Sequence, residues 1–118
     1  MKNKPANILV TEDDHDLAWM LYSMLTSKGF TVTLAHSVGA AAGMLEERSF
    51  DLLIMDMLLQ GANGTDLCRS LKKEPRSGKM PIIMMSAHPD GERLCLEAGA
   101  QRFIHKPFEL ARLLSMIQ

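Results

Sequence analysis

The sequence has little cysteine, little net charge and no long apolar run, and each shortage excludes a class of protein. Cys68 and Cys95 are the only cysteines among 118 residues, too few for a disulfide framework and not spaced as C-x-x-C metal ligands. The formal net charge of −1 provides no overall field to hold nucleic acid or an anionic membrane. No apolar run approaches the roughly 20 residues of a membrane span, and residues 1–7 lack the apolar core of a signal peptide. We therefore expect a cytoplasmic protein with reduced thiols, in which any DNA binding belongs to a separate module.

The sequence has enough apolar residues for one compact domain. Hydrophobic residues make up 47% of the chain, which suffices for a single sizeable core. Short apolar runs alternate with longer amphipathic stretches, as in the βα units of a parallel sheet. The expected strands are residues 7–11, 30–35, 51–55, 81–86 and 102–105, and the expected helices are residues 14–27, 37–47, 65–73, 91–98 and 108–117. We predict one α/β domain over residues 1–118.

Local signals agree with these boundaries. Ser37 can cap the second helix, while Gly29 and Gly99 follow the first and fourth helices, where a left-handed residue would end each. The strand at residues 30–35 alternates apolar and polar residues, which favours an edge position. Apolar residues at helical spacing in the first helix should face the sheet: Leu17, Met20, Leu21, Met24 and Leu25.

Polar residues that can carry chemistry directly follow the apolar runs. In an open parallel sheet, functional groups gather outside the carboxyl ends of the strands. The residues found there are Glu12, Asp13, Asp14, Asp56, Ser86 and Lys106. Crowded carboxylates repel one another unless a cation lies among them, and hard oxygen ligands suit Mg²⁺.

Each of these residues also has a purely structural interpretation. An acidic run at a helix start is commonly a solvated cap, and an Asp at a strand end can cap the following loop. A hydroxyl such as Ser86 closes many strands, and a lysine before a helix-starting proline is usually a surface residue. The combination of acids, hydroxyl and ammonium at one edge favours a functional site over these alternatives.

Four segments in this order resemble the response-regulator receiver domains of two-component phosphorelays. They are ILVTEDD at residues 8–14, DLLIMDMLLQGANG at 51–64, PIIMMSA at 81–87 and FIHKPF at 103–108. The resemblance spans essentially the whole chain. It implies a doubly wound, flavodoxin-like (βα)5 sandwich of three layers, with a parallel five-stranded sheet in the order 2-1-3-4-5 and two helices on one face and three on the other.

The resemblance also implies roles for individual residues. Asp56 resembles the phosphoacceptor, and Glu12 and Asp13 resemble the acidic pair that holds Mg²⁺, with Asp14 outside that pair. Leu58 is implied to bind the metal through its backbone carbonyl, and Lys106 to contact the phosphoryl group. Ser86 resembles the switch hydroxyl and Phe103 the switch aromatic. The peptide bond between Lys106 and Pro107 is expected to be cis. Such a domain is a signalling phosphoacceptor rather than an enzyme, since it catalyses only its own phosphorylation and slow dephosphorylation.

The implied partners are a sensor histidine kinase or phosphotransfer protein and an output domain beyond Gln118. A homodimer through the fourth helix, fifth strand and fifth helix is compatible with the resemblance. Neither nucleic acid nor membrane is an expected partner of this domain.

The sequence departs from the family pattern at a few positions. Gln60 stands where these domains usually carry proline, which should loosen the loop after Asp56. Phe103 replaces the commoner tyrosine, and the side chains of Leu58 and His88 flank the expected path of attacking water.

Three other functions remain as alternatives. A hydrolase of the haloacid dehalogenase type needs a second acid two residues after its nucleophile, where this chain has Leu58. A receiver-shaped module that only binds partners would not need the full set of site residues. A flavin-binding protein of the same topology would need a phosphate-cradling loop where the acids of residues 12–14 stand.

Overall fold

The computed structural model describes residues 6–117, which form five longer parallel strands, a small hairpin and five helices. The strands are β1 Asn7–Thr11, β2 Thr31–Ala35, β3 Leu52–Asp56, β4 Leu58–Leu59, β5 Ala62–Asn63, β6 Ile82–Ser86 and β7 Arg102–His105. The helices are α1 His15–Ser27, α2 Val38–Glu47, α3 Gly64–Lys73, α4 Gly91–Glu97 and α5 Leu110–Ile117. Every element predicted from the sequence is present, with ends that differ by no more than two residues. The expectations about residues 1–5 and about a continuation beyond Gln118 lie outside the described residues.

The five longer strands form one parallel sheet in the order β2-β1-β3-β6-β7. This order is the predicted 2-1-3-4-5, because β4 and β5 pair only with each other. The alternating strand β2 lies at the edge of the sheet, as its pattern predicts, while β1, β3 and β6 lie inside it. Inner strands are covered on both faces, which explains why β3 and β6 are buried along their whole length.

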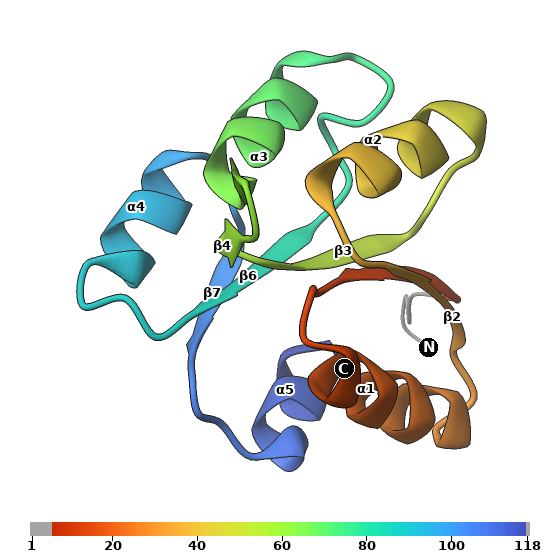
Figure 1. Ribbon diagram of the computed structural model, residues 1–118. Coiled ribbons are helices and arrows are strands. Elements are labelled where there is room, and N and C mark those ends of the chain that lie inside the picture. The colour runs from red at the N-terminus through yellow and green to blue at the C-terminus, as the bar shows by residue number, and fades with distance from the viewer. Residues whose placement is uncertain (1–5, 118) are drawn as a thin grey trace.

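Helices cover both faces of the sheet. Figure 1 shows α1 and α5 on one face and α2, α3 and α4 on the other. Successive strand residues point to opposite faces, so the apolar runs supply two cores. Leu9, Leu53 and Met84 belong to the core under α2, α3 and α4, whereas their strand neighbours Val10 and Ile54 belong to the core under α1 and α5.

Most of the signals read from the sequence act as predicted. The Asp14 carboxylate accepts hydrogen bonds from the N–H groups of Asp16 and Leu17, and Ser37 caps α2 in the same way. Gly29 and Gly99 have φ angles of 96° and 106°, a region that only glycine adopts readily. These caps and turns set where the chain leaves each helix and returns to the sheet.

Two features differ from the prediction. Met20 was expected to face the sheet, but its side chain is 52% exposed and the fully buried Ala18 takes an inward position instead. Met20 lies at the margin of the apolar stripe, where a flexible side chain can turn toward solvent. The hairpin of β4 and β5 was not predicted either, since two-residue strands leave no detectable periodicity. No helix within residues 6–117 combines the length and apolar character that crossing a lipid bilayer requires.

Candidate functional site

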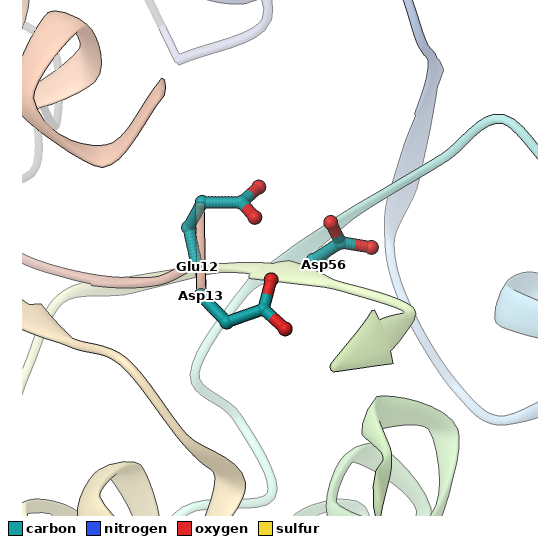
Figure 2. Close-up of side chains that lie close together, drawn as sticks. All are labelled: Glu12, Asp13 and Asp56. Carbon is teal, nitrogen blue, oxygen red and sulfur yellow. The ribbon is translucent and has the colours of Figure 1, made fainter. Parts of the chain in front are cut away.

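Three carboxylates meet at the carboxyl-end edge of the sheet. Thr11 of β1 pairs with Met55 of β3, so the next residue of each strand, Glu12 and Asp56, reaches the same edge. Glu12, Asp13 and Asp56 each offer an oxygen that lies within 4.8 Å of the others. Figure 2 shows the three side chains, two from the end of β1 and one from the end of β3, grouped around one point. The sequence predicted these three acids as a group, and the fold brings them together.

Lys106 supplies positive charge to this group from the end of β7. Its main-chain N–H donates to the Ser86 carbonyl oxygen at 2.9 Å, and the peptide bond to Pro107 is cis, as the resemblance implied. The Lys106 ammonium donates to Glu12 Oε1 at 3.0 Å and also to Asp56 Oδ2. The Lys106 side chain is 22% exposed, whereas those of Glu12 and Asp56 are 1% and 8% exposed.

Burial and neighbouring charges shift the pKa values of Glu12 and Lys106. Burial raises the pKa of Glu12 to about 7; hydrogen bonds from Lys106 and the Asp14 N–H oppose the rise, and the charge of Asp56 adds to it. Burial lowers the pKa of Lys106, but hydrogen bonds to Asp56 and Glu12 outweigh that effect and raise the pKa above its ordinary value. One ammonium facing three carboxylates leaves an excess of negative charge, so the cluster favours a further cation.

Asp13 and Asp14 have separate tasks. The Asp13 carboxylate belongs to the acidic group and accepts a hydrogen bond from the Gln60 N–H, with 2.7 Å between nitrogen and Oδ2. Asp14 is exposed and caps α1, so it stands outside the group, as predicted. The structural interpretation of an acid at a helix start therefore holds for Asp14 alone.

The remaining predicted residues surround the cluster. The Leu58 N–H donates to Asp56 Oδ1 at 3.0 Å, and its side chain is 51% exposed. Ser86 ends β6 and is buried, and its hydroxyl oxygen accepts from the His88 N–H at 2.9 Å. Phe103 on β7 is half-buried and packs against the core under α4.

The sequence analysis missed several contributors. A Cβ added to Gly91 would lie 2.9 Å from Phe103 Cζ and 3.2 Å from Ser86 Cβ, so glycine permits α4 to start against both residues. Through Nδ1, His36 bonds the Glu12 carbonyl oxygen at 3.0 Å, and its ring stacks on that of His15 with 4.1 Å between centroids. Gln60 acts through its main chain. A main-chain donor leaves no signal in residue type, and Gly91 by itself does not tell which residues approach it.

The described geometry suits a hard divalent cation and an attack on an electrophile by a carboxylate. The oxygen-only donor set of Glu12, Asp13 and Asp56 is the type that Mg²⁺ prefers. Asp56 is the acid nearest the lysine, which can neutralise charge on a group transferred to it.

Comparisons with known proteins place nearly the whole chain in one family. The family model described as the response regulator receiver domain matches residues 8–118. The phosphate regulon transcriptional regulatory protein PhoB of Rhizobium meliloti is 36% identical over 113 residues, which cover 94% of this chain and 50% of PhoB. The DNA-binding response regulator MtrA of Mycolicibacterium smegmatis is 36% identical over 113 residues, which cover 94% of this chain and 48% of MtrA. The chain thus spans about half the length of these relatives.

A solved structure of a receiver domain is also similar to this chain. The receiver domain of a sensor histidine kinase from Pseudomonas aeruginosa PAO1, whose crystal structure has a magnesium ion coordinated in the active-site cleft, is 30% identical. The two structures superpose with a TM-score of 0.87, and the match covers 96% of this chain and 94% of the kinase receiver domain. With this fold, this acidic group and these relatives, the chain belongs to the response regulator receiver domain family.

Proposed function

We propose that Asp56 is the phosphoacceptor of a two-component phosphorelay, and that a histidine kinase or phosphotransfer protein supplies the phosphoryl group. The observation that carries the proposal is the contact of Asp56 with Lys106 inside the acidic group. An acid at the end of an apolar strand is costly to bury without partners. The Lys106 ammonium alone would satisfy a structural acid, whereas Asp56 also lies beside the carboxylates of Glu12 and Asp13, a crowding that a structural acid would not need.

Glu12, Asp13 and Asp56 would hold Mg²⁺, with the Leu58 carbonyl as a further ligand. The donor set fits, because it consists of oxygens and carries more negative charge than Lys106 can offset. When bound, Mg²⁺ supplies positive charge that screens the acids and stabilises charge on the transferring phosphoryl oxygens.

In the proposed reaction, an Asp56 oxygen attacks phosphorus in line. A bond forms between that oxygen and phosphorus, while the bond between phosphorus and the donor nitrogen breaks and the imidazole leaves with its electron pair. Both Asp56 oxygens are engaged beforehand, Oδ1 by the Leu58 N–H and Oδ2 by the Lys106 ammonium. The ammonium can follow the negative charge from the carboxylate to the new phosphoryl oxygens, which keeps it paired throughout the transfer.

The switch proposed for the phosphorylated state uses Ser86 and Phe103. New phosphoryl oxygens would attract the Ser86 hydroxyl, and Phe103 would rotate into the space that it leaves. The close approach of Gly91 to both residues supports this coupling, because movement of either one alters the start of α4. Ser86→Ala and Phe103→Ala should each weaken the phosphorylation-dependent change in partner binding or dimerisation. An unaltered change in both variants would refute the switch.

The experiment that tests the phosphoacceptor is intact mass after incubation with acetyl phosphate. One acid-stable, base-labile phosphoryl adduct should form with Mg²⁺ and disappear with EDTA or in Asp56→Asn. Asp51→Asn is the matched control, because Asp51 is exposed and precedes the other end of β3. An adduct that survives in Asp56→Asn identifies another acceptor, and the lack of any adduct on native protein favours a module that only binds partners.

Turnover separates this proposal from a hydrolase. We propose that the domain is not a turnover enzyme and that it catalyses only its own phosphorylation and slow dephosphorylation. Leu58, at the position of the second acid in hydrolases of the dehalogenase type, cannot donate a proton to a leaving group. Steady phosphate release from a phosphomonoester at many equivalents per protein would refute this.

The biological setting belongs to the same proposal. A cytoplasmic location accords with two buried free thiols. Since the relatives are about twice as long, we propose that an output domain follows Gln118 in the full-length protein. The face formed by α4, β7 and α5, where Phe103 and Arg112 line a hollow, is the proposed surface for an output partner or a homodimer.

A further inference from the structure

A small hairpin connects Asp56 to the acid on the neighbouring strand. In the hairpin, Leu58 pairs with Asn63 and Leu59 with Ala62, and Gln60 and Gly61 form the turn. The Gln60 N–H donates to Asp13 Oδ2 at 2.7 Å, across 47 positions of sequence. The loop after Asp56 is therefore attached to the acidic group through Gln60, the position at which the resemblance leads one to expect proline.

We propose that the main-chain N–H of Gln60 is a positioning group, which holds the Asp13 carboxylate in place to receive Mg²⁺. This inference rests on the proposed function, because it concerns how that magnesium site is organised. It assigns a role to a residue whose side chain takes no part.

Asp13 depends on this bond more than the other two acids depend on any single donor. The Lys106 ammonium contacts Glu12 and Asp56, whereas within residues 6–117 the Gln60 N–H is the one hydrogen-bond donor to the Asp13 carboxylate. Asp13 is also half-buried, so water competes for it, and the two neighbouring carboxylates repel it. Without the donor, rotation of the Asp13 side chain toward solvent lowers its free energy, because it gains hydration and moves away from the two carboxylates that repel it.

The hairpin can act as a fixed mount, because both of its ends are attached close to Asp56. The Leu58 N–H donates to Asp56 Oδ1 at 3.0 Å, and the Gly64 N–H donates to the Met57 carbonyl oxygen at 2.7 Å. A Cβ at Gly64 would lie only 2.5 Å from the Asp56 carbonyl oxygen, so the chain after the hairpin runs directly against the strand end. The spacing between the Asp13 and Asp56 carboxylates is thus set by the hairpin backbone.

The turn allows a substitution that removes the donor and little else. Gly61 has a φ angle of 77°, as at the third position of a type II turn, where proline is favoured at the position before it. Gln60→Pro therefore suits the turn and deletes the N–H, and Leu59, in a strand, has the extended backbone that a following proline requires. Gln60→Ala is the matched control, since it removes the same exposed side chain and keeps the N–H.

Calorimetric titration with Mg²⁺ compares native protein, Gln60→Ala and Gln60→Pro, in the absence of any phosphodonor. We expect Gln60→Pro to bind Mg²⁺ about fivefold more weakly than native protein, on the scale of one hydrogen bond to a partly exposed charged group. Gln60→Ala should remain within about twofold of native protein, because it keeps that hydrogen bond. Equal or tighter binding by Gln60→Pro overturns the inference, as does an equal loss in both variants.

Amide exchange of Gln60 in metal-free protein gives a second measurement, which holds even if Gln60→Pro does not fold. The Gln60 amide should exchange at least about tenfold faster in Asp13→Ala than in native protein, because its acceptor is gone. Unchanged exchange overturns the inference. If native protein neither binds Mg²⁺ nor accepts phosphate from acetyl phosphate, the proposed function and this inference are both refuted. If native protein does both and Gln60→Pro binds Mg²⁺ as tightly as native protein, this inference alone is refuted.

Discussion

Lys106 is expected to stabilise the folded domain in the absence of a metal ion, and Lys106→Met isolates that contribution. Its ammonium contacts Glu12 Oε1 at 3.0 Å and also Asp56 Oδ2, and both acidic side chains are at least nine-tenths buried. Methionine keeps much of the side-chain length but not the charge. The variant therefore leaves two buried carboxylates without their cation.

The expected loss of stability follows from this geometry. Removing one partner of a buried ion pair destabilises a protein by about 3–5 kcal/mol. Lys106 is 22% exposed, and Glu12, whose pKa burial has raised to about 7, can take up a proton in its place. Both effects reduce the loss, so we expect about 2–3 kcal/mol at pH 8, or a fall of about 1–2 M in the urea midpoint.

The loss should be smaller at pH 6. Between pH 4.5 and about 7, native protein holds a proton on Glu12 more readily than the unfolded chain does, so this group's contribution to stability falls as pH rises through that window. Lys106 opposes the raised pKa of Glu12, and its removal should raise that pKa further. Protonation at pH 6 then neutralises one of the two carboxylates.

Urea unfolding followed by circular dichroism in EDTA, at pH 6 and pH 8, tests this reasoning. Lys79→Met is the control, because Lys79 is exposed and its substitution should change stability by about 0.5 kcal/mol or less. Saturating Mg²⁺ should narrow the difference in stability between Lys106→Met and native protein, because the ion replaces the missing positive charge and should therefore bind the variant more tightly. The same midpoint for Lys106→Met and native protein in EDTA at pH 8 would refute the reasoning.

Further predictions concern the core, the start of α4 and the thiols. Leu53 is fully buried, so Leu53→Ala should lower the free energy of unfolding by about 2–5 kcal/mol in urea, whereas Leu96→Ala, at a side chain 43% exposed, should lower it far less. Gly91→Ala should lower the free energy of unfolding by about 1–3 kcal/mol, because the new Cβ would lie 2.9 Å from the Phe103 ring. The aromatic NMR signals of Phe103 should shift for the same reason, and unmoved signals would contradict the prediction. Burial raises the pKa of Cys95 to about 12, so its thiol should resist iodoacetamide at pH 8 until urea unfolds the protein. Rapid labelling of Cys95 in folded protein would show that this thiol is not buried.

The secondary structure could be predicted because its signals are local. The apolar run of β6 and the alternating pattern of β2 indicated an inner and an edge strand, and the sheet has both in those places. Capping by Ser37 and the left-handed turn at Gly99 depend on the residue type at one position. Met20 was misplaced because periodicity states which stripe of a helix is apolar, but not how far the sheet extends beneath it.

The candidate site was predictable as a set of residues. Parallel strands bring their carboxyl ends to one edge, so Glu12, Asp13, Asp56 and Lys106 could be grouped without knowing any distance. Their shared location follows from strand order and from the positions of the acids and the lysine in the sequence. The family resemblance added expected roles, of which the magnesium and phosphate chemistry stays a proposal.

The sequence by itself thus determined the class of fold, the order of its elements and the residue types available at the sheet edge. Only the tertiary structure decided how these groups are paired. The Lys106 ammonium meets carboxylates 50 and 94 positions away, and the Gln60 N–H reaches Asp13 across 47 positions. Such contacts depend on the directions of side chains and main-chain donors after packing, which have no periodicity in the sequence. The physical reason is range along the chain: propensity and patterning act between residues a few positions apart, whereas ion pairs and hydrogen bonds form between any groups that the fold brings close together.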